Sequence, residues 1–581
     1  MENAEIARIF YEIADLLEVN GENPFRVRSY RNAADVIDGM PESLKTLAQK
    51  GEDGLKGIHG IGDSIREKIF ELLATGKCGL LEEILKQMPV GILDILRVSG
   101  IGPKKAGALY SALGIATLED LAEAASSGKL RLLDGFGEKT EAKILRSIKS
   151  LKAMSGVFKL SLARPYALTL TEYLGKVHGV TACEAAGSVR RWKETAGDID
   201  ILAACDNAEV VMERFTTHPD VKDVIAKGAA KSSVMLRVGI QADLRVVDEK
   251  CYGAALLYFT GSKAHNVALR DMAKRKGLKI NEYGVFSVKG EKWLAGKTEE
   301  DVYKAMGLAW IPPELRENKG ELIVAQSKKT FRLLEIADLR GDLHCHTSES
   351  DGSYSIEDMA FAAMSRGYEY LAITDHSKAV GVAHGLNEER VVAQMERIDA
   401  VNAKLKKRGK NFTILKGAEV DIRADGTLDH PDGVLDRLDL AVGAVHSSFN
   451  MDIKEMTARI VRAIKSGKID VLAHPTGRLI GAREPYAVDM EIVMDAAKKH
   501  GVALELNSYP DRLDLNDVHC NLAKHKGVMV ALSTDSHSVY NFENIIYGVH
   551  TARRGWLEKA DILNTMPLSA LLRHIRARRG L

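Results

Sequence analysis

Three aspartates near the middle of the chain have the spacing of a cation site for phosphoryl transfer. Asp198 and Asp200 flank Ile199 in a β-branched run, and Asp243 lies in a second such run. Because residues i and i+2 of a strand face the same way, the first two carboxylates converge, and the third could lie alongside them. Carboxylates gathered at one point repel each other unless divalent cations neutralise them. Two Mg²⁺ ions held in this way clamp the attacking and leaving oxygens of an in-line phosphoryl transfer.

A glycine-serine turn precedes these aspartates and could hold the phosphates of a substrate. Gly187, Ser188 and Arg191 offer a backbone N–H, a hydroxyl and a guanidinium to a triphosphate, and Gly197 comes directly before the first aspartate. An Asp-x-Asp pair alone is usually a pair of surface carboxylates. Its combination with an upstream Gly-Ser turn is typical of the nucleotidyltransferase superfamily.

The last third of the chain carries a second, histidine-rich set of possible metal ligands. Imidazole and carboxylate suit Zn²⁺, Mn²⁺ or Fe²⁺, and clustered ions of this kind activate a water and neutralise a phosphodiester. A single histidine at the end of a strand is more often structural, but so many together predict two or three divalent ions. Most follow short apolar runs, and the set is His344, His346, Asp351, His376, Glu419, His446, His474, Asp535 and His537.

The first 150 residues read as helices joined by glycine turns. Apolar residues recur there at helical spacing, and three turns share a Gly-apolar-Gly pattern. Two glycines allow a tight turn and a close approach to a phosphate, and the next helix presents free N–H groups to that anion. The repeat indicates helix-hairpin-helix elements that bind the DNA backbone without sequence preference. The turns are at Gly60–Gly62, Gly100–Gly102 and Gly135–Gly137, and Lys104 follows the second.

The remaining chain predicts a mixed sheet followed by a barrel. β-Branched runs over 198–202, 233–238 and 242–247 are typical of a mixed sheet, and Pro312-Pro313 precedes a polar stretch that we expect to be a linker. From residue 341, short strands alternate with helices, which is typical of a (β/α) barrel with its site at the strand ends. The expected strands are 370–374, 413–415, 440–445, 471–473, 503–506 and 528–533.

Composition adds few constraints on function. The 581 residues are too many for one core, and a net charge of +1 identifies no partner. The six cysteines form no C-x-x-C pair, which argues against disulfides and zinc fingers. With no long apolar run and no signal peptide, we expect a cytoplasmic protein, monomeric and without a membrane partner.

The motifs of the first 320 residues resemble family X DNA polymerases, the DNA polymerase beta type. The likeness is carried by GSVRRWKETAGDIDIL from Gly187, by Asp243-Leu244-Arg245 and by YFTGSKAHN from Tyr258. It implies metal-ligating roles for the three aspartates, with Mg²⁺ or Mn²⁺, and Asp243 as acceptor of the primer 3′-hydroxyl proton. It implies triphosphate contacts by Ser188, Arg191 and Gly197, a template contact by Arg270, and a deoxynucleotide pocket lined by Tyr258, Phe259, Gly261 and Asn266. Lys263 departs from the family, which has an acidic residue there.

The same resemblance extends to a possible lyase and to the domain order. Lys68 follows Gly60-Ile61-Gly62 at the spacing of the family's Schiff-base lysine, although an exposed helix lysine is the simpler interpretation and Ser64 replaces a family lysine. We expect a lyase-like domain at 1–90, fingers at 91–155, a palm at 156–250, a thumb at 251–318, a linker at 319–340 and a barrel at 341–575.

The histidine-rich third is similar to the PHP (polymerase and histidinol phosphatase) family, with all nine ligand positions filled. That fold is a distorted (β/α)7 barrel. His384, Arg478 and Arg483 are further candidates for contacts to a substrate phosphate. A family X polymerase followed by PHP is the bacterial and archaeal PolX arrangement. It implies 3′–5′ exonuclease activity, with cleavage at abasic sites or removal of 3′-phosphates as further options.

The sequence therefore predicts a repair polymerase that acts on gapped or primed DNA with deoxynucleoside triphosphates and also trims DNA ends. Two other functions stay open: a PHP small-molecule phosphatase with a vestigial polymerase core, and a non-catalytic DNA-binding scaffold with structural metals. A template-independent nucleotidyltransferase is a variant of the main hypothesis.

Overall fold

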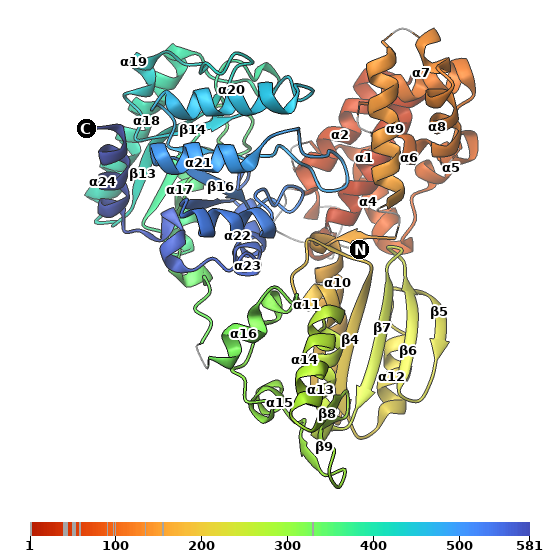
Figure 1. Ribbon diagram of the computed structural model, residues 1–581. Helices are drawn as coiled ribbons and strands as arrows, with labels where there is room; N and C mark the ends of the chain where they lie inside the picture. Colours follow the sequence, from red (N-terminus) through yellow and green to blue (C-terminus); the bar gives the residue numbers. More distant parts are fainter. Residues whose placement is uncertain are drawn as a thin grey trace. The chain divides into compact units, whose positions relative to one another are not determined.

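The computed structural model describes residues 3–38, 44–48, 54–56, 58, 60–89, 91–96, 98, 100–133, 135–153, 156–327 and 330–580 (Figure 1). The chain divides into two compact units. One comprises residues 1–155 with the short segment 481–484, and the other comprises 156–480 with 485–581. In the described ranges, no helix combines the length and apolarity needed to cross a membrane.

The first unit is helical, as its periodicity predicts. Its helices bury one continuous apolar core, which includes Phe10, Ile69 and Leu109. Gly60 and Gly100 have φ of 88° and 91°, a region that L side chains rarely adopt, so each turn depends on glycine. The elements are α1 Asn3–Val19, α2 Pro24–Asp38, α3 Leu44–Ala48, α4 Asp63–Thr75, α5 Gly79–Gln87, α6 Ile92–Leu96, α7 Pro103–Leu113, α8 Leu118–Ser126, η2 Lys129–Leu132 and α9 Glu138–Ala153.

The second unit begins with a five-stranded sheet of order β2-β4-β7-β6-β5, in which only the β4–β7 pair is parallel. Helices α10 and α12 pack on the sheet, and Ile199, Leu244 and Phe215 lie in the resulting core. A two-stranded ribbon of β1 and β3 stands beside it. The bounds are β1 Phe158–Lys159, α10 Leu160–Gly175, β2 Val180–Ala185, α11 Gly187–Arg190, β3 Thr195–Ala196, β4 Asp198–Cys205, α12 Ala208–Thr216, β5 Val221–Lys227, β6 Lys231–Leu236 and β7 Gln241–Val247.

Helices α13 to α16 follow, with a small antiparallel sheet of β8, β9 and β10. Helix α16 lies within the stretch that we expected to be a linker, and Glu321 at its start is fully buried against His265. The bounds are η3 Glu249–Cys251, α13 Tyr252–Thr260, α14 Lys263–Arg275, β8 Leu278–Asn281, β9 Gly284–Ser287, β10 Trp293–Ala295, α15 Glu299–Ala305, η4 Pro313–Leu315 and α16 Glu321–Gln326.

A barrel of seven parallel strands completes the unit, in the order β11 to β17. A bridge between Cys345 and Ser536 joins the segments that follow the first and last strands. Helices surround the strands (Figure 1), which confirms the predicted (β/α)7 barrel. The strands are β11 Gly341–Asp342, β12 Tyr370–Ile373, β13 Thr413–Asp421, β14 Leu440–Ala444, β15 Val471–Leu472, β16 Ala503–Asn507 and β17 Val530–Ser533. The main helices are α17 Ile356–Ser365, α18 Glu388–Lys407, α19 Asp432–Leu435, α20 Ile453–Lys465, α21 Met490–His500, α22 Asp517–Lys526, α23 Ile545–Arg554 and α24 Leu568–Arg579.

Charged side chains connect the barrel to the segments before it. Glu314 is buried and accepts hydrogen bonds from Arg553 at 2.7 Å and from His550 at 2.8 Å, both on α23. These two partners hold the pKa of Glu314 at about 2, although burial alone would raise it. The α23 helix is therefore anchored to the η4 turn by an ionised carboxylate.

Candidate functional site

The three aspartates lie together on the two central, parallel strands of the five-stranded sheet. Asp200 of β4 pairs in register with Asp243 of β7, and Asp198 precedes Asp200 on the same face. Burial and the charges of the other two aspartates raise the pKa of Asp200 to about 6. Such a site is poorly stable without counter-charge, so the donor set fits divalent cations.

Gly187, in the Gly-Ser turn, lies directly against the carboxylate of Asp200. Its φ is 58°, and a Cβ placed on it would lie 2.3 Å from the carboxylate Oδ2 of Asp200. The backbone amide of Ala186 donates to the carbonyl of Asp200 at 2.8 Å. The phosphate turn can therefore approach the carboxylates only because residue 187 has no side chain.

Two further residues hold Asp243 and were missed by the sequence reasoning. Lys231 of β6 lies 2.6 Å from one carboxylate oxygen, and the Gln241 amide donates to the other at 2.8 Å. Burial would raise the pKa of Asp243, but these hydrogen bonds and one from Ser233 hold it below its usual value. Gln241 lies two residues before Asp243 on one face, a spacing that could have signalled it.

The other residues expected around the nucleotide do not all converge. Arg191 donates to the Thr260 carbonyl and lies 3.1 Å from Glu317, so its guanidinium is engaged within the protein. Gly261 lies beside Arg191 and has a φ of 70°. A Cβ added to Gly261 would lie 3.2 Å from Arg191 Nη1. Phe259 does not line the pocket that contains Tyr258 and Asn266. Its ring packs against Arg245, whose guanidinium lies 4.4 Å from the ring centroid.

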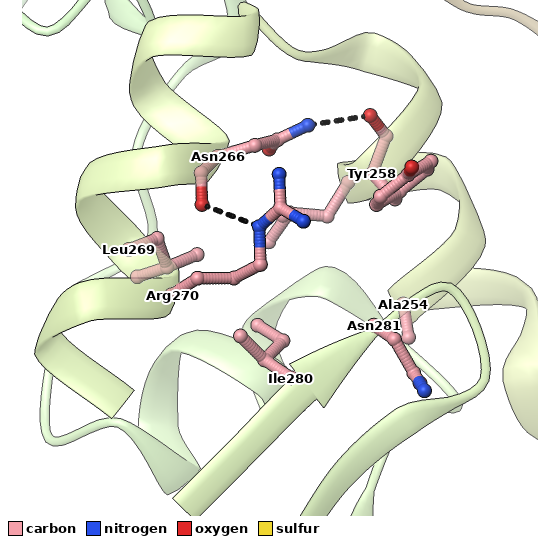
Figure 2. A pocket seen from close by; sticks show the side chains of 8 residues that line it. Ala254, Tyr258, Asn266, Leu269, Arg270, Ile280 and Asn281 are labelled. Atoms are coloured by element: carbon pink, nitrogen blue, oxygen red, sulfur yellow. Dashed lines mark hydrogen bonds between the residues drawn. The ribbon is translucent and has the colours of Figure 1, made fainter. Parts of the chain in front are cut away.

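Figure 2 shows the pocket between α13 and α14 that collects the remaining members of this set. The Asn266 amide donates to the Tyr258 carbonyl at 2.7 Å, and the Arg270 guanidinium donates to the Asn266 carbonyl at 3.3 Å. Ile280 and Asn281 of β8 complete the wall. The structure thus brings together Tyr258, Asn266 and Arg270.

All nine predicted ligands of the barrel converge at the carboxyl ends of its strands. Glu419 lies at their centre, with its carboxylate 2.7 Å from His376, 3.0 Å from His474 and 3.2 Å from His446. Three overlapping groups could each hold an ion: His346, Asp351, His376 and His537; His344, His346 and Asp535; and His376, Glu419 and His446.

The cluster has the chemistry of a divalent metal centre. Burial and the neighbouring His537 and His376 lower the pKa of His346 to about 3, which leaves its imidazole neutral and able to coordinate. His346 Nδ1 and His474 Nδ1 are buried, and neither has a hydrogen-bond partner among the described residues. Unsatisfied buried donors and acceptors are costly, so these residues fit bound cations.

Carboxylates that the sequence reasoning missed orient the histidines. Glu505 of β16 lies 2.7 Å from His344 Nδ1, and Asp421 of β13 lies 3.2 Å from His446 Nδ1. Such partners fix the imidazole orientation and raise its basicity. Glu505 and Asn507 share the i, i+2 spacing at a strand end that marks His344 and His346, and this pattern could have revealed them.

The further candidates for phosphate contacts belong to none of the three possible metal groups. Arg478 hydrogen bonds to Glu194 at 2.7 Å and to the carbonyls of Arg512 and Leu513. His384 is exposed, with φ 55°. Arg483 lies in the segment assigned to the first compact unit.

In the first unit, Lys68 of α4 faces a pocket of about 680 Å³ that Arg26, Ser29 and Tyr30 also line. Its Nζ lies 3.1 Å from Ser64 Oγ. Gly62 and Gly102 are exposed, and a Cβ added to either would meet nothing within 4 Å; Lys104 is exposed beside the second turn. Both turns therefore leave room for a DNA backbone.

Comparison with known proteins decides the family. Residues 1–78 match a helix-hairpin-helix domain, 92–150 a SAM-like helix-hairpin-helix tandem, 255–317 the DNA polymerase beta thumb and 342–509 the PHP domain. The DNA polymerase/3′-5′ exonuclease PolX of Bacillus subtilis (strain 168) is 38% identical over 98% of both chains. The chain belongs to the PolX family. The resemblance stated from the motifs is thereby confirmed.

Other relatives of this PolX-family chain match only part of it. A probable phosphatase of Thermoanaerobacter sp. (strain X514) is 30% identical over 39% of the chain and 89% of its own length. A probable phosphatase of Shewanella sp. (strain MR-4) is 29% identical over 41% of the chain and 92% of its own length.

Proposed function

We propose that the protein is a DNA-directed DNA polymerase that fills short gaps during repair, and that its barrel is a metal-dependent 3′–5′ exonuclease. The observation that carries this proposal is the presence of two complete sites in one chain. The Asp198, Asp200 and Asp243 site lies beside a phosphate turn, and the nine-residue cluster lies in the barrel. The Bacillus subtilis relative, which bears both activities in its name, spans both sites.

At the polymerase site, the three aspartates hold Mg²⁺ or Mn²⁺, which neutralise the α-phosphate and activate the primer hydroxyl when bound. Gly187 and Ser188 bind the triphosphate, and Gly197 supplies backbone next to Asp198. Asp243 accepts the proton of the primer 3′-hydroxyl in this scheme. Its lowered pKa makes it a weak base, so we assign it first the task of holding a cation.

The nucleotide and template are held by α13 and α14. Tyr258 and Asn266 line the deoxynucleotide pocket together with Phe259 and Gly261, and Arg270 lies on the template side. Arg191 must exchange Glu317 for phosphate oxygens when a triphosphate binds. Gly60, Gly62, Gly100, Gly102 and Lys104 bind the DNA backbone, and Lys68 is the candidate lyase nucleophile.

At the barrel, the ligands hold two or three ions, which we assign to Zn²⁺, Mn²⁺ or Fe²⁺ from their nitrogen and oxygen donors. Such ions supply a nucleophile at neutral pH and neutralise the phosphodiester when bound. Glu505 and Asp421 orient His344 and His446 for this task. Abasic-site cleavage and removal of 3′-phosphates would use the same cluster. We expect a cytoplasmic monomer acting on gapped or primed DNA with deoxynucleoside triphosphates.

The small-molecule phosphatase and the scaffold are less well supported. The probable phosphatases match 39% and 41% of the chain, whereas the chain also keeps three converging aspartates that a vestigial polymerase would not need. A non-catalytic scaffold is disfavoured because the Bacillus subtilis relative, which is similar over 98% of both chains, carries two enzymatic activities in its name.

The test is a gel assay on a 5′-labelled duplex with a one-nucleotide gap, with Mg²⁺ or Mn²⁺ and with or without deoxynucleoside triphosphates. Wild type should lengthen the primer when nucleotides are present and shorten it when they are absent. Asp198→Ala/Asp200→Ala should lose only extension, and His344→Ala should lose only shortening. Omitting the template strand separates a template-independent transferase. Hydrolysis of small phosphate monoesters without either DNA activity would refute the proposal in favour of a phosphatase.

A further inference from the structure

Arg512, in the loop between β16 and α22, points at the metal cluster without completing its hydrogen bonds. Its Nε lies 3.6 Å from Asp535 Oδ2, which is beyond hydrogen-bonding distance. That Oδ2 already accepts from the Asn507 amide at 3.0 Å. The Nη1 atom of Arg512 is buried and has no hydrogen-bond partner among the described residues.

A structural role alone accounts poorly for this geometry. Leaving a guanidinium nitrogen buried and unpaired costs free energy, and such groups are rare in folded proteins. Arg512 forms only a long ion pair with Asp535, at 3.6 Å through Nε, and this pair leaves Nη1 without a partner among the described residues. The guanidinium is a planar fork of donors that matches the oxygens of a phosphate. Its unused donors therefore fit an anion held at the cluster.

The loop that carries Arg512 is held in place from several directions. Arg478 donates to the carbonyls of Arg512 at 2.9 Å and of Leu513 at 2.6 Å. Leu513 has φ 42°, a conformation that persists only where the surroundings enforce it. Asp514, next along the chain, accepts from the Thr476 amide at 2.9 Å. Arg478 thus holds the backbone from which the Arg512 side chain extends.

The polymerase half supplies the partner that holds Arg478. Glu194 binds its guanidinium with both carboxylate oxygens, at 2.7 and 3.3 Å. Lys159 forms a second ion pair of 2.7 Å with Asp511, at the start of the same loop. Lys159 belongs to β1 and Glu194 directly precedes β3, so one two-stranded ribbon makes both contacts. That ribbon continues into β4 and its metal-site aspartates.

We propose that Arg512 binds the phosphate of the DNA end at the nuclease site, and that Glu194 of the polymerase half positions it through Arg478. This inference rests on the proposed nuclease function and names a substrate contact within it. Arg512 touches the substrate, whereas Glu194 and Arg478 are positioning residues. The barrel alone would then hold its ions but present a loosely held Arg512 to the substrate.

The first experiment compares Arg512→Ala and Arg512→Lys with Arg408→Ala, a matched control that removes an exposed arginine from the end of α18. Loss of a charged hydrogen bond to phosphate predicts a rise in exonuclease KM of about ten- to a hundredfold for Arg512→Ala. Arg512→Lys should be intermediate, because lysine retains the charge without the fork. Bound Mn²⁺, measured on the full-length protein, should stay at the wild-type level in all three.

A binding measurement keeps this inference separate from the nuclease proposal. Inorganic phosphate is titrated calorimetrically into the Mn²⁺-loaded protein in an Asp198→Ala/Asp200→Ala background, which removes the phosphate affinity of the polymerase site. Adding Arg512→Ala should weaken binding about tenfold or more, and adding Arg408→Ala should not. If wild type trims no DNA, the nuclease proposal fails and this titration alone decides the role of Arg512. If Arg512→Ala and Arg408→Ala bind phosphate with equal affinity, Arg512 does not bind the phosphate and the inference is wrong.

The positioning role is tested by non-additivity. Glu194→Ala should lower exonuclease kcat/KM by about three- to tenfold, because a pair that acts on one side chain couples by roughly one kcal/mol. Glu172→Ala, which breaks an exposed ion pair of 2.7 Å with Lys176, is the matched control. In Arg512→Ala, adding Glu194→Ala should cost nothing further. Independent, multiplying losses would show that Glu194 does not act through Arg512.

Discussion

The Nδ1 atom of His344 lies 2.7 Å from Oε1 of Glu505, and neither side chain reaches solvent. The other oxygen of Glu505 accepts the backbone amide of His474 at 2.7 Å, so one carboxylate positions two of the proposed ligands. Losing such a partner weakens metal binding by about ten- to a hundredfold. We expect Glu505→Gln to lose Mn²⁺ affinity by this factor, measured by equilibrium dialysis. Asp436→Asn, which removes a surface partner of Lys468, should bind as wild type.

The contact between Gly187 and Asp200 makes a prediction for the polymerase site. Gly187→Ala would place a Cβ 2.3 Å from the Asp200 carboxylate, at a φ of 58° that alanine rarely adopts. The turn or the carboxylate must move, and displacements of about 1 Å at a reacting centre can cost about a hundredfold in rate. Primer extension should fall accordingly, while shortening persists.

The control is Gly175→Ala, at the end of α10, where a Cβ meets nothing within 4 Å and φ is not positive. It should extend primers at the wild-type rate. Wild-type extension by Gly187→Ala would show that the turn has no need to approach Asp200 so closely.

The buried Glu299 predicts an acid-dependent loss of stability. It accepts hydrogen bonds from Arg316 at 2.5 and 2.8 Å and from Arg190 at 2.7 Å. Burial opposes ionisation, but the two arginines hold its pKa at about 2, below the usual 4.5. Because the folded-state pKa is depressed, the stabilisation is complete above pH 4.5 and is lost as pH falls from there towards 2. It amounts to roughly 3 kcal/mol by linkage.

Thermal unfolding of wild type and Glu299→Gln at pH 7 and pH 3 checks this prediction. The variant should melt lower at pH 7, because the buried Arg316 and the half-buried Arg190 lose their charged partner. The difference between the two proteins should shrink at pH 3, because the carboxylate of the unfolded wild-type chain is protonated at that pH. A difference that does not change with pH would mean that Glu299 is not ionised in the folded protein.

Lys68 makes a covalent prediction for the first unit. Its pocket, lined by Arg26, Tyr30 and the Gly60–Gly62 turn, offers a cation and N–H groups to a 5′-phosphate. If Lys68 is the nucleophile, borohydride should trap the wild-type protein on a duplex with a 5′-deoxyribose phosphate. Lys68→Ala should lose this trapped adduct, because the imine that borohydride reduces can no longer form. Lys86→Ala, an exposed lysine of α5, is the control. Equal trapping by both variants would exclude Lys68.

Periodicity and ligand spacing predicted the architecture well where the structure depends only on residues that are close together in the sequence. The i, i+2 spacing of Asp198 and Asp200 indicates one face of a strand, and β4 has that geometry. The apolar run at 440–445 predicted β14, and the run at 503–506 predicted β16. The polar stretch after Pro313 was less informative, because burial of Glu321 against His265 depends on a partner 56 residues away.

The sequence by itself determined which residues could carry chemistry, since histidines and carboxylates at strand ends are a matter of residue type and spacing. Only the tertiary structure decided which of them meet. It paired Arg191 with Glu317 and Arg478 with Glu194. It also revealed that Lys231, Glu505 and Arg512 contact the proposed metal ligands. Such partners lie far apart along the chain, and hydrogen bonds act over about 3 Å. Which side chains come that close depends on how strands and loops pack, and no local pattern records it.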